Sequence, residues 1–201
     1  MDHPKRLPTL ERRRQIAEAA LRILASRGAS RLTAAALAAE VGITDGAIFR
    51  HYKSKDEIVD AAIDLFEATL ESTFPEAAGE PLARLREFVE RRLALVRRTP
   101  ELMRLAFNDR LAEAAGEDRS TRIAAVVGRS AAFVHACIVE AQARGEVAND
   151  VSPTVLVWMV IGVIRGAARG GPQNVPGEQD IQQSPPDVVW SQLERLLRST
   201  R

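Results

Sequence analysis

The chain has 201 residues, of which 46% are hydrophobic and 27% are charged, and these are the proportions of an ordinary globular protein. Its length allows one domain or two small ones. The single cysteine, Cys137, excludes an internal disulfide and a thiolate-rich zinc site, and with only three histidines we expect no metal ion and no cofactor. The amino-terminal stretch MDHPKRLPTLERRR lacks the apolar core of a signal peptide, so we expect a cytoplasmic protein.

The positive charge is concentrated near the amino terminus. Residues 1–55 contain 11 Lys and Arg against 5 Asp and Glu, a net charge of +6, whereas residues 56–201 contain 17 against 22, a net charge of −5. This asymmetry favours an anionic partner for the amino-terminal part. Because helix surfaces are often charged, an ordinary solvated surface is the alternative.

Apolar residues recur at spacings of three and four along most of the chain, and alternating β-branched residues are almost absent. This periodicity predicts an all-α protein with about nine helices. The expected helices cover residues 10–26, 34–41, 45–52, 54–74, 82–98, 100–114, 118–144, 153–169 and 186–199. The polar, turn-rich stretch 170–185 is expected to be a flexible loop.

Residues with helix-capping chemistry mark the ends of these helices. Ser54 and Glu57 form the predicted capping box of a long helix, in which the Ser54 hydroxyl accepts from the Glu57 amide while Glu57 reaches back. Other expected start and stop signals are Thr9, Thr99-Pro100 and Ser152-Pro153 at helix starts, and Gly28, Gly42 and Gly145 at helix ends.

The stretch 34–52 has the spacing of a helix-turn-helix. Gly42 lies where the tight turn needs a permissive backbone. The apolar contacts between the two helices are assigned to Leu37, Val41, Ile43 and Ile48. Short helices joined by a glycine also occur in structural bundles, so the spacing alone leaves both interpretations open.

The first turn of the second helix in this pair carries the candidate base-reading residues Thr44, Asp45 and Gly46, with Arg50 one turn later. A glycine in a helix interior costs about 1 kcal/mol of stability relative to alanine. The presence of Gly46 therefore indicates that the helix backbone is approached closely at this position. Arg50 has the geometry to bind guanine O6 and N7. Asp45 either accepts from a cytosine amino group or stabilises the helix amino terminus.

Basic residues follow directly. Lys53 and Lys55 are candidate phosphate contacts, with a solvated helix face as the alternative. His51 either approaches the DNA backbone or packs locally.

With these residues in place, the stretch LTAAALAAEVGITDGAIFRHYKSKDEIVDAAI resembles the amino-terminal DNA-binding domain of TetR-family bacterial transcriptional regulators. The resemblance rests on a threonine, a Leu-Ala pair, a glycine turn, an aromatic-x-His-aromatic run and a lysine, here Thr33, Leu37-Ala38, Gly42-Ile43, Phe49–Tyr52 and Lys55. It implies a DNA-binding surface made of Thr33, Thr44, Asp45, Gly46, Phe49, Arg50, His51, Lys53 and Lys55.

One position departs from the family pattern. The family commonly has a phosphate-binding tyrosine where this chain has Phe49, and phenylalanine has no hydroxyl to make that bond. Tyr52 stands where phenylalanine is usual, so we expect its ring to pack inward without replacing the lost contact.

The resemblance also implies two domains: a helix-turn-helix DNA-binding domain at 1–55 and an effector-binding and dimerisation domain at 56–201, with 54–74 as the linking helix. The apolar run in 154–170 is too short to span a bilayer, which needs about 20 residues, so we expect no membrane association. Together with 187–197 it is a candidate dimer interface, with intrachain packing as the alternative. The residues assigned to this interface are Gly162, Gly166, Val188, Trp190, Leu193 and Leu197.

Large or polarisable side chains at helical spacings give a candidate ligand pocket, although such stripes are more often plain core. These residues are Met103, Phe107, Phe133, Cys137, Trp158 and Met159.

Three functions compete at this point. The leading hypothesis is a homodimeric repressor that binds a palindromic double-stranded DNA operator and is released by a small apolar effector. The second keeps DNA binding but makes the other partner a protein. The third, an enzyme, is disfavoured because no phosphate loop or nucleophile motif occurs, and because His135 and Cys137 are two apart and would point to different sides of a helix.

Overall fold

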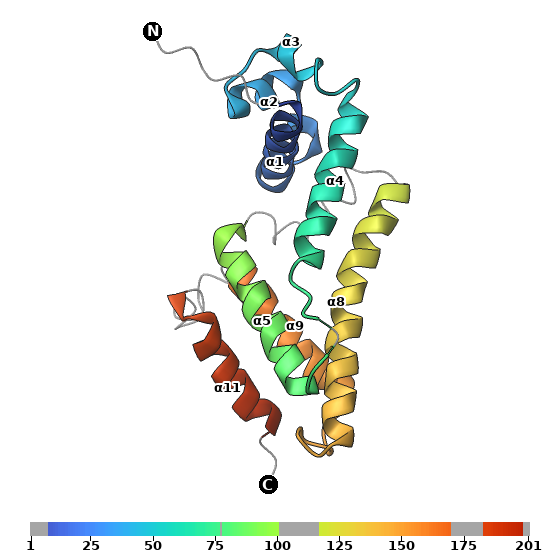
Figure 1. Ribbon diagram of the computed structural model, residues 1–201, viewed down its shortest axis with the longest axis vertical. Coiled ribbons are helices and arrows are strands. Elements are labelled where there is room, and N and C mark those ends of the chain that lie inside the picture. The colour runs from blue at the N-terminus through green and yellow to red at the C-terminus, as the bar shows by residue number, and fades with distance from the viewer. Residues whose placement is uncertain (1–7, 77, 101–116, 170–182, 199–201) are drawn as a thin grey trace. The chain divides into compact units, whose positions relative to one another are not determined.

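A computed structural model of the chain describes residues 8–76, 78–100, 117–169 and 183–198. Within these ranges the protein is all-α, as predicted, with eight α-helices, one 3-10 turn and no strand. The chain divides into two compact units (Figure 1). The described residues of the first unit are 8–69 and 117–123, and the remaining described residues form the second.

The first unit holds the predicted helix-turn-helix. Its helices are α1 (Thr9–Arg27), the 3-10 turn η1 (Ala29–Arg31), α2 (Ala34–Val41), α3 (Asp45–Ile48) and most of α4 (Lys55–Glu71). The α2 bounds agree with the prediction because both of its ends are fixed locally. The Thr33 hydroxyl accepts from the Ala36 amide at 3.1 Å, and Gly42 adopts the left-handed conformation with φ of 73°.

Two other helices of this unit differ from expectation. Thr9 is the first residue of α1 and not its N-cap, and no side chain caps that end. Helix α3 ends at Ile48, short of the expected end near Tyr52. The chain after Ile48 continues as a turn, in which the His51 and Tyr52 amides both donate to the Ile48 carbonyl, at 3.0 and 3.1 Å.

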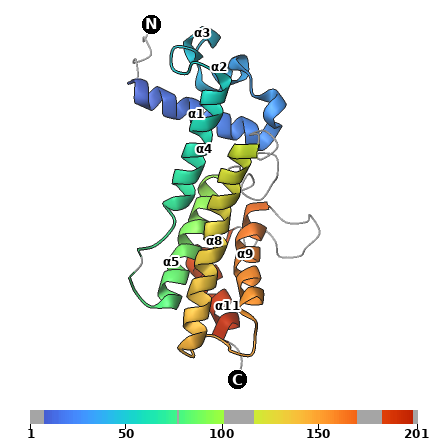
Figure 2. The same ribbon diagram turned by 90° about the vertical axis from the view of Figure 1, so that its right-hand side faces the viewer.

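The second unit contains α5 (Pro81–Arg98), most of α8 (Glu117–Ala143), α9 (Pro153–Arg169) and α11 (Pro186–Arg198). These bounds match the sequence-based ranges to within one or two residues. Helix α5 packs against both α9 and α11, and Figure 2 shows these helices from a second side. Phe88 of α5 meets Phe133 of α8 with ring centroids 5.1 Å apart. All but the first residue of the expected helix at 100–114, and most of the expected loop at 170–185, lie outside the described residues.

Most of the buried stripe of α4 belongs to the first unit, which in this helix ends at residue 69. Ile58, Ala62 and Phe66 are all buried, so this part of α4 completes the core of the first unit. The predicted division at 55/56 separates the DNA-reading residues from the rest, and it stays a prediction about function.

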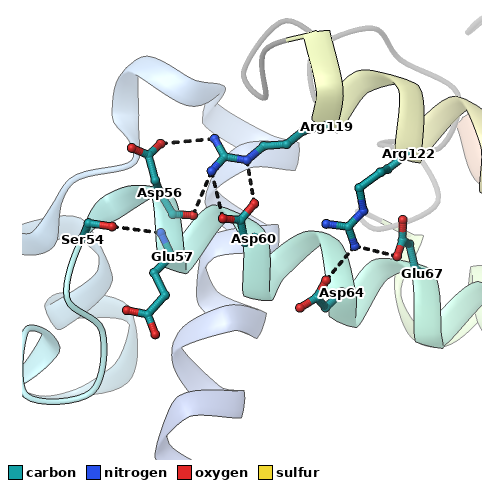
Figure 3. Close-up of polar contacts among 8 residues, drawn as sticks. All are labelled: Ser54, Asp56, Glu57, Asp60, Asp64, Glu67, Arg119 and Arg122. Atoms are coloured by element: carbon teal, nitrogen blue, oxygen red, sulfur yellow. Dashed lines mark hydrogen bonds and ion pairs between the residues drawn. The ribbon is translucent and has the colours of Figure 1, made fainter.

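Four carboxylates on successive turns of α4 face two arginines of α8 within the first unit (Figure 3). Arg119 binds Asp60 at 2.6 Å and Asp56 at 3.2 Å. Arg122 binds Asp64 at 2.7 Å and Glu67 at 2.8 Å. The hydrogen bond from Arg119 lowers the pKa of Asp60, which fixes its charge at neutral pH.

Residues Asp118–Ala143 of α8 are, by length and composition alone, apolar enough to cross a membrane, with a mean hydropathy of 1.5. A buried helix of a soluble protein passes the same test. Since Arg119 and Arg122 of this segment are paired with α4, the amino-terminal part of α8 belongs to a polar contact between helices.

Replacing Asp60 by Asn should lower the free energy of unfolding at neutral pH by about 0.5 to 1 kcal/mol, because the pair is partly exposed. The folded-state pKa of Asp60 is lowered, so its contribution is complete above the ordinary value of 3.8 and is lost as the pH falls through the folded-state pKa. Urea unfolding curves of both proteins from neutral to acidic pH should therefore converge in acid. Asp150→Asn, at an exposed position, is the control and should match the wild type throughout. A difference that persists undiminished in acid would contradict the assignment.

Candidate nucleic-acid interface

The segment Thr44–Arg50 exposes polar groups to solvent and is held in place by one buried apolar residue, Ile48. Ile48 has no exposed surface and fixes α3 in the core of the first unit. Thr44, Asp45, Gly46, Phe49 and Arg50 are all exposed. The structure therefore brings together the residues that the sequence assigned to base reading, on one short segment with a single buried anchor.

Arg13 of α1 fixes the end of this segment, and sequence reasoning did not identify it. Its guanidinium donates to the His51 carbonyl, binds the Glu57 carboxylate at 2.9 Å and lies 4.1 Å from the centroid of the Tyr52 ring. The Tyr52 hydroxyl donates in return to the Arg13 carbonyl at 3.0 Å. One signal was available in the sequence: position 13 falls on the same helix stripe as Ile16 and Ala20, which are buried.

The start of α4 has a modified capping box. The Glu57 amide donates to the Ser54 hydroxyl at 3.1 Å, as predicted. The Glu57 carboxylate reaches back to the Lys53 amide at 2.7 Å, one residue before the position that a standard capping box uses. The Lys53 hydrogen bond and the Arg13 contact lower the pKa of Glu57, so this carboxylate stays charged and paired beside the candidate phosphate contacts.

The candidate phosphate contacts lie at the starts of α2 and α4. Thr33 caps α2, and Lys53 and Lys55 are exposed around the amino terminus of α4. The Lys55 ammonium lies 3.5 Å from the Ala29 carbonyl, a long contact that leaves the amine available. Helix amino termini and lysines both attract anions, so this edge is suited to a phosphate backbone.

His51 lies in the turn that follows α3, and three arginines act on its ring. Burial is the largest cause that lowers the pKa of His51, and the neighbouring cations Arg12, Arg13 and Arg50 lower it further. The ring is therefore neutral at neutral pH, and its buried Nδ1 has no hydrogen-bond partner among the described residues. The surroundings of His51 are electropositive, as a DNA-facing surface requires.

The aromatic pair follows the expected arrangement. Tyr52 is 2% exposed, which confirms that its ring packs inward. Phe49 is 54% exposed and places an apolar ring on the surface beside Arg50.

The predicted dimer residues fall into two groups. Gly162 and Gly166 on α9 are exposed, and a Cβ added at either position would meet no atom within 4 Å beyond the backbone of its own helix. Val188 is 39% exposed. Trp190, Leu193 and Leu197 are buried within the second unit, where α11 packs on α5, so intrachain packing explains their apolar character.

The predicted pocket residues are similarly divided. Phe133 is half-buried, Cys137 is 1% exposed and Met159 is half-buried. Trp158 is 61% exposed and does not line the interior of the chain. Met103 and Phe107 lie outside the described residues. The role of this set stays a prediction.

Burial also raises the pKa of the Cys137 thiol, which keeps it protonated. Across the described ranges, no group of three or more His, Cys, Asp or Glu side chains is placed to hold a metal ion.

Comparison with known proteins identifies both parts of the chain. Residues 16–67 match the model of bacterial regulatory proteins of the tetR family, and residues 84–187 match the model of the tetracyclin repressor-like C-terminal domain. The second match alone spans more than half of the chain.

Curated relatives match the chain in part. It is 33% identical over 109 residues to the nucleoid occlusion factor SlmA of Pasteurella multocida, which covers 52% of this chain and 55% of the relative. It is 35% identical over 100 residues to SlmA of Vibrio cholerae, covering 48% and 51%. The chain thus spans about half the length of the curated relatives it matches.

Solved structures match over nearly the whole chain. The ketosteroid transcriptional regulator KstR2 of Mycobacterium tuberculosis aligns with a TM-score of 0.71 at 19% identity, covering 90% of this chain and 94% of that one. The regulator AibR, solved with isovaleryl coenzyme A and operator DNA, aligns with a TM-score of 0.69 at 21% identity, covering 93% and 98%. At these identities the similarity shows the fold.

The family models and the exposed, basic helix-turn-helix agree on one conclusion. The chain belongs to the tetR family of bacterial regulatory proteins and is a DNA-binding transcriptional regulator.

Proposed function

We propose that this protein is a homodimeric repressor that binds a palindromic operator in the cytoplasm and is released from it by a small, largely apolar effector. The observation that carries the DNA-binding part is the exposed segment Thr44–Arg50, anchored by Ile48 and held at its end by Arg13. A short helix presented in this way has the geometry that enters a major groove.

The exposed groups on this segment and at the starts of α2 and α4 have different roles. Arg50 reads a guanine edge, and Asp45 accepts from a cytosine amino group or stabilises the start of α3. Thr33, Lys53 and Lys55 contact phosphates and set the register of the protein on the duplex. Phe49 contributes an apolar contact to a sugar or to a thymine methyl group, since it lacks a hydroxyl.

The dimer is formed through α9. Val155 and Trp158 are 52% and 61% exposed, and Gly162 and Gly166 continue the same face of the helix. An apolar face whose glycines let a second helix approach closely suits a symmetric contact with another copy of the chain. To bind a palindromic operator, the dimer has to hold its two recognition helices about 34 to 36 Å apart, so that they enter successive major grooves.

The effector part is supported by the match of residues 84–187 to the repressor-like C-terminal domain. It is also supported by AibR, which has the same fold and was solved with both a small molecule and operator DNA. Any ligand that favours a conformation with the wrong spacing of recognition helices weakens operator binding, and operator DNA weakens ligand binding equally.

A protein partner in place of the small molecule is the second candidate. It is favoured by the curated relatives, which are named nucleoid occlusion factors. The chain spans only about half of their length, so no residue of this chain is assigned to a protein contact on that ground.

Selection of bound DNA from genomic fragments tests the DNA binding that both candidates share. A palindromic consensus supports a dimeric repressor, and binding without any consensus would contradict it.

Arg50→Ala should weaken binding to the selected operator by about 1 to 3 kcal/mol and relax the preference at one base position, because it removes a bidentate contact to guanine. Lys55→Ala is the matched comparison. It should weaken binding to all sequences and reduce the slope of the salt dependence by about one. Fluorescence anisotropy on the operator and on its single-base variants measures both. Equal losses for Arg50→Ala on every sequence would show that it contacts only the backbone.

Gly46→Ala should weaken operator binding without destabilising the protein. The α3 backbone leaves open space around Gly46, and alanine stabilises a helix by about 0.5 to 1 kcal/mol relative to glycine, so stability should hold or rise. Gly42→Ala is the control with the opposite effect on folding, because its φ of 73° costs an alanine about 1 to 2 kcal/mol. Thermal unfolding and operator titration separate the two. Unchanged operator affinity in Gly46→Ala would rule out a close approach of the DNA backbone there.

Gly162→Leu should weaken the dimer by about 1 to 3 kcal/mol, because a large side chain blocks the approach of the second α9. Ala83→Leu, at an exposed small residue of α5, is the control and should leave the dimer intact. Sedimentation velocity over a range of concentrations measures the dissociation constant. A Gly162→Leu protein that remains dimeric at the same concentrations as the wild type would exclude this face of α9.

A further inference from the structure

The buried polar side chains of the described residues gather at one place in the second unit. Three such side chains are buried: Thr73, Arg92 and Ser130. The Thr73 hydroxyl donates to the Leu70 carbonyl at 2.7 Å, and Arg92 donates to the same carbonyl at 3.4 Å and to the Ser130 hydroxyl at 3.1 Å. We call Thr73, Arg92 and Ser130 the buried polar cluster.

Arg92 carries the only buried charge in the described part of the chain, and that charge has no counter-ion there. Its side chain, on α5, is 3% exposed and forms none of the ion pairs within those ranges. Glu71 is the carboxylate whose charge acts on Arg92, but it is bound to Arg129. A buried cation without a paired anion is costly, so its retention requires an explanation.

The hydrogen-bonding capacity of Arg92 is also incomplete. A guanidinium has five N–H donors, and the contacts to Leu70 and Ser130 both come from one nitrogen, Nη2. The buried Nε has no partner among the described residues. Burial lowers the pKa of Arg92 to about 10, which still leaves it protonated at neutral pH. The positive charge is therefore present, and the Nε donor has no acceptor among the described residues.

The surroundings of the cluster are aromatic. Phe74, Phe88 and Phe133 form a set of three rings with centroids 5.1 to 5.4 Å apart. The Arg92 guanidinium lies 4.9 Å from the centroid of Phe88 and 5.8 Å from that of Phe74. A ligand with one anionic group and an apolar body matches this combination of a cation, two hydroxyls and three rings.

We propose that the buried polar cluster is the anion-binding end of the effector site, and that the effector is an organic carboxylate with an apolar body. This inference rests on the proposed function and narrows its effector from an apolar molecule to an acid. The carboxylate accepts from Arg92. It accepts from Ser130 as well when that hydroxyl turns from the Val126 carbonyl, to which it donates at 3.5 Å, and the apolar body lies against the phenylalanine rings.

The buried polar cluster contacts the carboxyl end of α4, the helix whose amino terminus follows the DNA-binding segment. The Leu70 carbonyl is in the last turn of α4, and Arg92 donates to it at 3.4 Å. A carboxylate that takes over this donor removes a cation from the carboxyl end of α4, where cations are favoured. Effector binding and the end of α4 are thus coupled through one side chain.

A purely structural role is the competing explanation, since a cation at the carboxyl end of α4 stabilises that helix. The test uses the full-length protein and four probes: sodium benzoate, phenylacetate, hexanoate and decanoate. The matched neutral amides of the same acids differ from them only in charge. Arg92→Met removes the cation, and Arg86→Met, at an exposed arginine of the same helix paired with Glu90, is the control.

Isothermal titration calorimetry should show saturable binding of at least one carboxylate to the wild type, about tenfold or more tighter than its amide. Arg92→Met should bind the acid and the amide equally, and Arg86→Met should behave as the wild type. If Arg92→Met does not fold, Arg92→Lys takes its place. It should bind the carboxylate more weakly than the wild type does and the amide with the same affinity. Equal binding of acid and amide by the wild type, no binding of any carboxylate, or unchanged carboxylate affinity in either Arg92 variant would overturn the proposal.

Release from the selected operator, measured in parallel, separates this inference from the proposed function. A carboxylate that binds through Arg92 but leaves the operator complex intact supports the anion site and contradicts release by an effector. Release by neutral compounds alone contradicts the anion site and supports the broader proposal.

Discussion

The contact of Arg13 with the turn after α3 is the interaction on which the DNA-facing surface depends. Helix α3 is only four residues long, and a helix of that length is not stable by itself in water. It holds its position because Ile48 is buried and because Arg13 binds the His51 carbonyl, the Tyr52 ring and Glu57 together. One side chain of α1 thus fixes both the end of the reading segment and the start of α4.

Local signals in the sequence predicted the helices well, and the contacts between them poorly. Thr33, Gly42 and Ser54 act within a few residues of themselves, so the ends of α2 and the start of α4 could be predicted. The role of Arg13 depends on residues 38 or more positions away, and no local pattern encodes that distance. Periodicity likewise identified the apolar stripe of α11, but it could not show that α11 packs on α5 of the same chain or that Trp190 is buried there.

The candidate site was predictable to the same extent. Residue type and spacing placed the exposed groups of Thr44–Arg50 on one segment, because a glycine turn and one anchor residue dictate that geometry. The pocket residues were chosen for size and polarisability, and those properties do not distinguish an interior from an exposed position, as Trp158 illustrates. Arg92 was missed for the opposite reason: an arginine within a charged helix is normally exposed, and only the packing of α5 and α8 shows that this one is buried.

Charge pairing reconciles an acidic α4 with a DNA-facing edge at its start. Asp56, Glu57 and Asp60 lie within the first two turns of α4, beside Lys53 and Lys55, and unpaired carboxylates there would repel phosphates. Arg119 binds the two aspartates and Arg13 binds Glu57, so each acid is matched by a cation from another helix. The acids next to the proposed phosphate contacts Lys53 and Lys55 are therefore paired, and they oppose an approaching phosphate less than free carboxylates would. The pairs that hold α4 against its neighbours therefore also preserve the positive potential of the reading surface.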